Sequence, residues 1–306
     1  MRKSPFSQPS PCPNFAPSGL RRIWQCLLFL SALSLASAVC AQNPAGDEEW
    51  VTLFNGVDLT GWTAKIRGHE LGQNYASTFR VEDGLLTVSY DGYDDYKDQF
   101  GHLFYQQAFS HYRLRLDYRF IGETAPGAPD WAIRNSGVML HSQAPESMPR
   151  EQDFPISVEF QFLGGFGGGE ARATGNLCTP GTNIVYQGEF NETHCIISSA
   201  PTFDGEQWVR AEALVLGDKR IVHFINDEPV IEYQAITFGG GVVSGHRPEM
   251  KPDGKPLGEG YISLQSESHP IQFRNVQLLN LKGCMDPLAT NYKSYFVEPD
   301  PESCIF

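Results

Sequence analysis

The stretch Asn135-Ser-Gly-Val-Met-Leu-His141, followed by Pro155-Ile-Ser-Val-Glu-Phe-Gln-Phe-Leu163, decides the fold of this chain. Side chains alternate between the two faces of a strand, so each stretch predicts a strand with one apolar face and one polar face. The first apolar face carries Val138 and Leu140, and the second is made of aliphatic and aromatic side chains. The polar positions are Asn135, His141, Glu159 and Gln161.

A polar face of this kind has two interpretations. It can present hydrogen-bond donors, acceptors and titratable groups to the hydroxyls of a sugar, as on the concave sheet of a sugar-binding sandwich. It can equally be a solvated outer face, which for a single strand is at least as common. Two such strands in succession favour a binding site.

The pattern outside these strands is also β. Residues 112–120 alternate strictly between apolar and charged, which predicts a half-buried strand. Residues 208–216 and 220–225 predict a hairpin around Gly217 and Asp218. Two further strands are expected over 261–265 and 271–279, the second with a bulge near Asn275. Many short strands with Gly and Pro turns predict an all-β sandwich or jelly roll.

The first 41 residues have the features of a signal peptide: basic residues, a short apolar run and small residues before Ala41. Cleavage there predicts a secreted or periplasmic protein. A lipoprotein anchored at Cys40 is less favoured, because Val39 is a poor fit to the small residue that such a site needs. No later stretch is long and apolar enough to span a membrane. A net charge of −13 argues against nucleic acid and anionic membranes as partners.

Four cysteines follow the expected cleavage site, and they allow three pairings. The local pairs, Cys178 with Cys195 and Cys284 with Cys304, are the simplest. A zinc site is the rival interpretation, since His194 adjoins Cys195. No CxxC pair supports zinc, and export favours disulfides.

Several landmarks give the chain a family resemblance. Residues 50–62, 79–86, 135–138, 158–161, 260–265 and 269–276 resemble, in order, the landmarks of the 3-keto-disaccharide hydrolase domain family. The resemblance covers about residues 48 to 281. The tail, 282–306, instead looks like a short disulfide appendage behind secreted bacterial domains. Asp286, Asn291 and Asp300 there could bind calcium, although a structural clip is favoured.

The resemblance implies a concanavalin-like jelly roll that acts on glycosides already oxidised at C3. A carbonyl at C3 acidifies the C2 proton, so a base can remove it and expel the aglycone from C1. Water then adds, which gives net hydrolysis. Such a site needs a base, an acid and an electrophile near the C3 oxygen, and a divalent cation (Ca, Mn or Zn) could be that electrophile. It also implies an upstream oxidoreductase that makes the 3-keto sugar.

Glu159 and His141 are the expected base and its metal or hydroxyl partner, with Gln161 and Asn135 orienting the substrate. The family often has Arg where His141 stands, and the alternative roles are a structural histidine and an ion-paired Glu159. The further candidates are Trp131, Arg134, Arg150, His194, Glu267 and His269.

Two other functions compete with this one. A retaining glucanase needs a second carboxylate about 5–5.5 Å from the first. The strand of Glu159 continues with Gln161 and Leu163 instead, so this chemistry requires a distant Asp or Glu. A non-catalytic, lectin-like glycan-binding module is the second alternative, because fold does not imply function.

Overall fold

Antiparallel strands account for nearly all regular structure in residues 48–306, the part of the chain that this computed structural model describes. The signal peptide expected over 1–41 lies outside the described residues. The helical elements of 48–306 are short 3-10 turns, and none of the described helices has the length and apolar character to span a membrane. These turns are η1 (Tyr75–Ser77), η2 (Asp130–Ala132), η3 (Pro145–Ser147), η4 (Pro248–Met250) and η5 (Pro301–Ser303).

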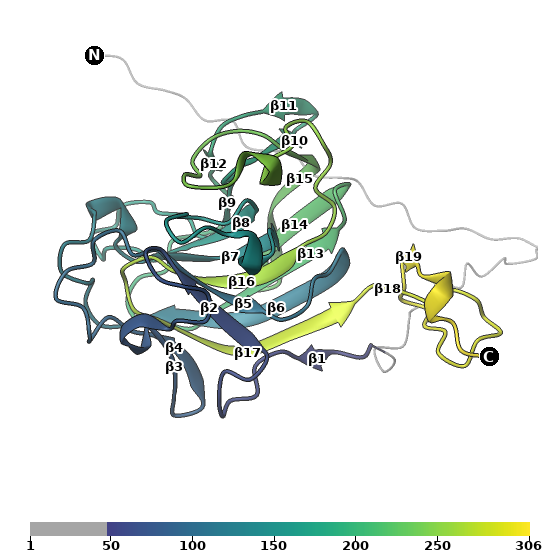
Figure 1. Ribbon diagram of the computed structural model, residues 1–306, viewed down its shortest axis with the longest axis horizontal. Coiled ribbons are helices and arrows are strands. Elements are labelled where there is room, and N and C mark those ends of the chain that lie inside the picture. Colours follow the sequence, from purple (N-terminus) through teal and green to yellow (C-terminus); the bar gives the residue numbers. More distant parts are fainter. Residues whose placement is uncertain (1–47) are drawn as a thin grey trace, which may run out of the picture. The chain divides into compact units, whose positions relative to one another are not determined.

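Two large sheets form the sandwich (Figure 1). The ten-stranded sheet has the order β11 (Glu189–Asn191), β10 (Thr182–Tyr186), β15 (Glu228–Phe238), β14 (Arg220–Ile225), β13 (Val209–Leu216), β6 (His111–Phe120), β17 (Ile271–Asn280), β4 (Leu85–Val88) and β3 (Phe79–Glu82), with β1 (Val51–Thr52) also paired to β17. The seven-stranded sheet has the order β12 (Cys195–Ile196), β9 (Asn176–Cys178), β8 (Val158–Leu163), β7 (Asn135–Ser142), β16 (Tyr261–Ser266), β5 (Gly101–Tyr105) and β2 (Trp62–Ile66). The expected all-β jelly-roll sandwich is confirmed.

The core lies between the two sheets and is built from the apolar faces that the sequence predicts. Tyr118 of β6 stacks on Phe162 of β8, with ring centroids 4.1 Å apart. Phe160 of β8 stacks on His223 of β14 at 4.0 Å. Because residues 158, 160 and 162 point into this core, the intervening Glu159 and Gln161 must point to the opposite face.

The turns follow the expected chemistry. Gly217 has φ +59° between β13 and β14, and Asn226 and Asp227 both have positive φ between β14 and β15. Left-handed residues suit the tight turns of hairpins. The bulge near Asn275 is confirmed, since the pairing of β17 with β6 shifts between Arg274 and Gln277.

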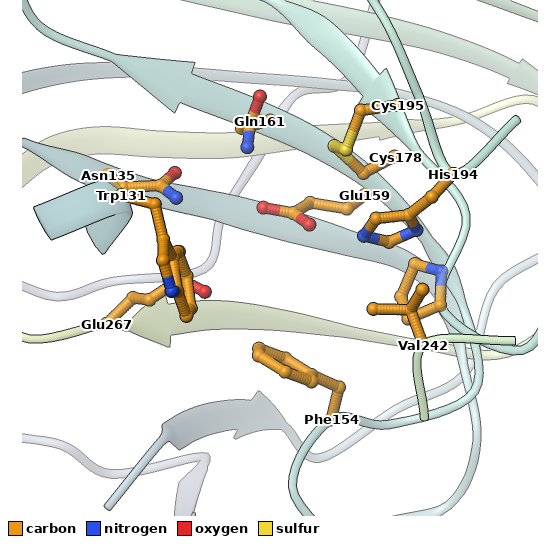
Figure 2. A pocket seen from close by; sticks show the side chains of 11 residues that line it. Trp131, Asn135, Phe154, Glu159, Gln161, Cys178, His194, Cys195, Val242 and Glu267 are labelled. Atoms are coloured by element: carbon orange, nitrogen blue, oxygen red, sulfur yellow. A yellow bond between two sulfur atoms is a disulfide. The ribbon is translucent and has the colours of Figure 1, made fainter. Parts of the chain in front are cut away.

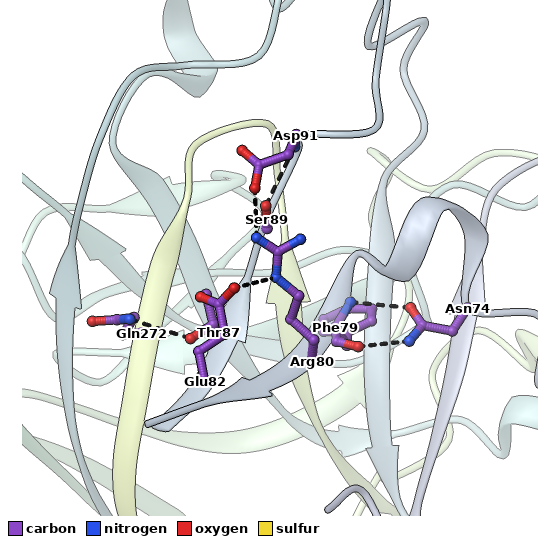
Figure 3. Close-up of polar contacts among 8 residues, drawn as sticks. All are labelled: Asn74, Phe79, Arg80, Glu82, Thr87, Ser89, Asp91 and Gln272. Carbon is purple, nitrogen blue, oxygen red and sulfur yellow. Dashed lines mark hydrogen bonds and ion pairs between the residues drawn. The ribbon is translucent and has the colours of Figure 1, made fainter. Parts of the chain in front are cut away.

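A polar network holds the β3–β4 hairpin at the edge of the ten-stranded sheet (Figure 3). Arg80 forms ion pairs with Glu82 at 2.7 Å and with Asp91 at 2.5 Å. Asn74 bonds both backbone groups of Phe79, through its amide nitrogen at 2.6 Å and its oxygen at 3.0 Å. The two ion pairs are partly exposed to solvent, so each contributes little to stability.

Both local disulfides form, Cys178–Cys195 across β9 and β12 and Cys284–Cys304 in the tail. The tail also contains the parallel pair β18 (Lys282–Gly283) and β19 (Glu298–Pro299). Asn291 donates to the carbonyl of Ser303 and accepts from the amide of Ile305, so its side chain clips the chain end.

Candidate functional site

A pocket of about 290 Å³ lies on the face of the seven-stranded sheet that is turned away from the core. The segments that carry Trp131, Phe154 and Val242 supply the walls of the pocket (Figure 2). Its lining residues are Trp131, Asn135, Phe154, Glu159, Gln161, Cys178, Pro180, His194, Cys195, Val242 and Glu267.

Glu159 lies at the centre of this pocket (Figure 2). Its neighbours across the sheet are Met139 on β7 and Cys178 on β9. Its carboxylate lies over Gly137, where a Cβ atom would be 2.7 Å from Oε1. Only glycine at this position leaves room for the carboxylate. Glu159 is 5 % exposed, and its Oε1 has no hydrogen-bond partner within residues 48–306.

Glu267 is the second carboxyl group of the pocket. It follows β16, the neighbour of β7, and is 4 % exposed. Burial raises the pKa of Glu159 to about 8. Burial, together with repulsion from Glu159, raises the pKa of Glu267 well above its usual range. The pair therefore retains protons at neutral pH, because two buried like charges are costly to ionise together.

Polar and aromatic groups surround the carboxyl pair. Asn135 Oδ1 and His194 Nδ1 are buried and lack a hydrogen-bond partner among the described residues. The pKa of His194 is lowered by burial, so its ring is neutral near pH 7. Gln161 accepts a 3.0 Å hydrogen bond from the Asn176 amide, which fixes its orientation. Trp131, 55 % exposed, contributes a ring to the pocket rim.

The disulfide Cys178–Cys195 forms part of the pocket wall. The potential ligand atoms of Cys178, His194 and Cys195 lie within 4.8 Å of one another, which is the geometry behind the zinc alternative. The two cysteines are bonded to each other, however, and metal binding needs free thiolates. In this oxidised state the alternative of a zinc site at these cysteines is wrong.

His141 lies outside the pocket, contrary to the expectation that it would share a cavity with Glu159. Between β7 and β16 the pairing shifts, so that the four residues from Met139 to Ser142 face the three from Tyr261 to Ser263. His141 has φ +51° at this bulge. The extra residue reverses the alternation, and the ring lies near Tyr112 of the opposite sheet, bonded to the Gly217 carbonyl at 3.1 Å.

Three other expected residues also lie away from the pocket lining. Arg134 bonds the Gly205 carbonyl, and Arg150 bonds the Gly68 carbonyl at 2.7 Å. His269 bonds Thr124 at 2.7 Å and packs against Phe120. Each of these side chains stabilises a loop rather than lining the cavity.

Sequence reasoning missed Phe154, Pro180 and Val242, which line the pocket from loops. It also gave Glu267 a lesser role than its pairing with Glu159 indicates. No periodic signal marks loop residues, but a carboxylate directly after the expected strand 261–265 was a usable signal for Glu267.

The donor chemistry of the pocket suits an oxygen-seeking divalent cation. Oxygens of Asn135, Glu159 and Glu267 are buried and unpartnered in the described part of the chain. Carboxylate and amide oxygens are the ligands that Ca²⁺ and Mn²⁺ prefer.

The fold and the pocket together define a jelly-roll β-sandwich with a buried acidic site, an arrangement of the carbohydrate-active kind. The chain belongs to the 3-keto-alpha-glucoside-1,2-lyase-like domain family, whose sequence pattern matches residues 49–279. A comparison with curated protein sequences found no matching relative.

Solved structures with a similar fold were also found. Two are proteins of Parabacteroides distasonis ATCC 8503 provisionally described as glycosyl hydrolases. The first is 17 % identical, covers 76 % of this chain and 100 % of its own, and has a TM-score of 0.45. The second is 18 % identical, covers 76 % and 94 %, and has the same TM-score. A galectin-like protein of Bacillus subtilis is 11 % identical, covers 76 % and 94 %, and has a TM-score of 0.41.

Proposed function

We propose that this protein cleaves glycosides oxidised at C3, by proton abstraction at C2, elimination of the aglycone and hydration. Family membership supports the substrate class. The observation that carries the proposal is the buried pair Glu159 and Glu267, two carboxyl groups with raised pKa values in one pocket.

The carboxyl pair can supply both proton transfers. When Glu159 has lost its proton and Glu267 keeps its own, the carboxylate of Glu159 accepts the C2 proton of the 3-keto sugar. The C1–O bond then breaks as the C1=C2 double bond forms, and the protonated Glu267 donates to the leaving oxygen. Water adds to C1, giving a proton to the Glu267 carboxylate, and Glu159 returns its proton to C2, which gives the free 3-keto sugar. A carboxylate with a pKa near 8 is a stronger base than an ordinary one, which favours the abstraction step.

The surrounding groups have positioning roles. The Asn135 amide and the neutral His194 ring present hydrogen-bonding atoms to sugar oxygens, and Trp131 provides an apolar face at the rim. A divalent cation held by Asn135, Glu159 and Glu267 would displace the protons of the carboxyl pair and polarise the C3 carbonyl, so it would be an alternative to proton donation by Glu267.

One specific observation favours a second candidate function. The strand of Glu159 lacks a second carboxylate, but Glu267 reaches the same pocket from β16. Ordinary acid–base hydrolysis of glycosides also uses a pair of carboxyl groups. That chemistry would act on unoxidised glycosides.

An NMR time course separates these functions. The protein, residues 42–306, is mixed with methyl 3-keto-glucoside and, separately, with methyl glucoside, each with and without a chelator. Loss of the C2 proton signal and methanol release from the keto sugar alone support the proposal, and chelator sensitivity supports a cation. Cleavage of the unoxidised sugar supports ordinary hydrolysis. Line broadening without turnover of either sugar would favour a glycan-binding module and overturn the proposal.

Two further points belong to the proposal. A substrate oxidised at C3 requires an oxidoreductase acting earlier on the same sugar. The two disulfides agree with a secreted or periplasmic location.

A further inference from the structure

The outer face of the ten-stranded sheet carries positive charge, although the whole chain has a net charge of −13. Alternate residues of the neighbouring strands β6, β13 and β17 point away from the core. The charged residues on this outer face of the three strands are five arginines and two carboxylates: Arg113, Arg115, Asp117, Arg119, Arg210, Glu212 and Arg274. Positive charge is therefore concentrated on the middle strands of this sheet.

A pocket of about 230 Å³ lies between these side chains. Arg115 of β6 and Arg210 of β13 line it, together with Asp117, Asn275 and Gln277. It is separate from the pocket of the carboxyl pair, which belongs to the other sheet. Burial, together with repulsion from Arg210, lowers the pKa of Arg115. The two guanidinium groups are therefore close enough to oppose each other's charge.

Arg115 forms no ion pair with a carboxylate in residues 48–306. Glu212 faces it across the sheet, but Oε1 of Glu212 accepts a 2.8 Å hydrogen bond from Nε of Arg113. Arg115 instead lies over the ring of Trp50, 3.7 Å from the ring centroid, and its Nε donates to Oε1 of Gln277 at 2.9 Å. These contacts fix the position of the guanidinium group while leaving its charge uncompensated.

Arg210 has one weak ion pair. Asp117 faces it across the sheet, but Oδ2 of Asp117 accepts from Arg274 at 3.0 Å and from the Asn275 amide at 2.8 Å. The charge of Asp117 is thereby compensated. Arg210 contacts Asp227 at 3.3 Å, and the side chain of this turn residue is 70 % exposed. Because exposed pairs contribute little, the guanidinium group of Arg210 remains available to another anion.

We propose that Arg115 and Arg210 form a binding site for a sulfate or phosphate group on the outer face of the ten-stranded sheet. Hydrogen bonds between guanidinium groups and oxyanions are charge-assisted and strong. The amide nitrogen of Gln277 adds a neutral donor, because its oxygen already accepts from Arg115. Donors on three adjacent strands suit a tetrahedral anion, and an anion between the two arginines removes their repulsion. The group is either a free ion or a substituent of a sulfated glycan.

The test measures binding and does not depend on the proposed function. Calorimetry at low ionic strength, where screening is weak, measures the affinities of inorganic sulfate and of a dextran sulfate oligosaccharide. Because Arg115→Gln and Arg210→Gln each remove charge-assisted hydrogen bonds, we expect each to weaken binding about tenfold. Arg210→Gln removes only an exposed ion pair from the fold, so it keeps the test valid if Arg115→Gln does not fold.

Arg220→Gln is the matched control. Arg220 lies on the same face, since it pairs with Leu216, six residues after Arg210 on β13. Its guanidinium group binds both carboxylate oxygens of Glu232, at 2.8 and 2.9 Å. This variant loses the same charge but no available donor, so its affinity should stay within twofold of wild type.

The outcomes decide both the site and the source of the anion. Selective loss in either folded variant supports the site. Binding of inorganic sulfate then indicates a free ion, and binding of the oligosaccharide alone indicates a glycan substituent. A wild type that binds neither ligand overturns the site, as does unchanged affinity in both variants. An equal loss in Arg220→Gln also overturns it, because it would show a general response to net charge.

Discussion

Glu159 is a buried carboxyl group with no compensating cation. No arginine or lysine forms an ion pair with it among the described residues, so the alternative of an ion-paired strand carboxylate is wrong. Burial raises its pKa to about 8, which costs stability. Such a residue is a functional-site candidate, because proteins rarely retain that cost without a use.

His141, the other expected catalytic residue, lies outside the pocket. Burial lowers the pKa of this ring to about 4, and its Nε2 lies 3.1 Å from the Gly217 carbonyl. A neutral histidine that donates to a backbone carbonyl between two sheets is structural. The geometry of His141 therefore agrees with the alternative interpretation, a hydrogen-bonded structural histidine.

Replacing Glu159 by glutamine tests its role as the base. The amide keeps the shape but cannot accept the C2 proton, so we expect kcat on a 3-keto-glucoside to fall by about 10² to 10⁴. Steady-state kinetics measure the loss. The control Glu232→Gln changes an exposed carboxylate of β15 that pairs with Arg220 of β14, and it should retain wild-type kcat. Wild-type turnover by Glu159→Gln would assign the base elsewhere.

At the scale of elements, the pair β7–β8 builds the site. Gly137 of β7 leaves the space that the Glu159 side chain occupies. Farther along β7, the bulge turns His141 away from the same face. β7 therefore leaves space for Glu159 and turns His141 away from the pocket.

Gly137→Ala should displace the carboxylate of Glu159, which lies directly over Gly137. The new Cβ would lie 2.7 Å from Glu159 Oε1 and 2.9 Å from the Phe160 carbonyl, so the carboxylate and β8 must move. We expect a loss of about 1–3 kcal/mol in unfolding free energy and at least a tenfold loss in kcat. Urea unfolding and kinetics measure the two effects.

Gly168→Ala is the matched control for this substitution. Its Cβ would meet no atom within 4 Å, so stability and kcat should stay at wild-type values. A Gly137→Ala variant that behaves like this control would show that Glu159 does not need its present position.

At the scale of the whole molecule, the buried histidines and the buried carboxyl pair have opposite effects on the pH dependence of the unfolding free energy. Burial lowers the pKa values of the histidines and raises those of the carboxyl pair. The histidines with values of about 3 to 4 are His102, His141, His223 and His269.

The sign of each effect follows from proton uptake. The unfolded chain protonates its histidines near pH 6.5, whereas the folded chain does not, so stability falls as pH drops from about 6.5 toward 4. The folded chain instead keeps the protons of Glu159 and Glu267, which the unfolded chain releases near pH 4.3. Stability contributed by this pair falls as pH rises from about 4.3 through 8.

These two opposite pH dependences predict a maximum in unfolding free energy near pH 6.5. Urea unfolding at a series of pH values measures it. Glu267→Gln removes one of the two raised carboxyl groups and should flatten the decline above about pH 6.5. It should also steepen the rise in stability between about pH 4.3 and 6.5, because Glu267 no longer opposes the histidines there. An unaltered alkaline decline in this variant would contradict the raised pKa of Glu267.

The sequence by itself determined the features that depend on local order. The alternation along residues 112–120, the turn at Gly217, the bulge at Asn275 and the two local disulfides all appear as expected. Glu159 faces the pocket for the same reason, because a period of two needs only its own strand.

Only the tertiary structure decided which residues share the pocket. Glu267 joins Glu159 because β7 lies between β16 and β8, the strand of Glu159, although more than 100 positions separate the two residues in the sequence. Phe154 and Val242 arrive on loops that carry no periodic signal, and the bulge against β16 removes His141. Sheet order and strand register come from contacts between distant segments, so the alternation of a single strand cannot reveal them.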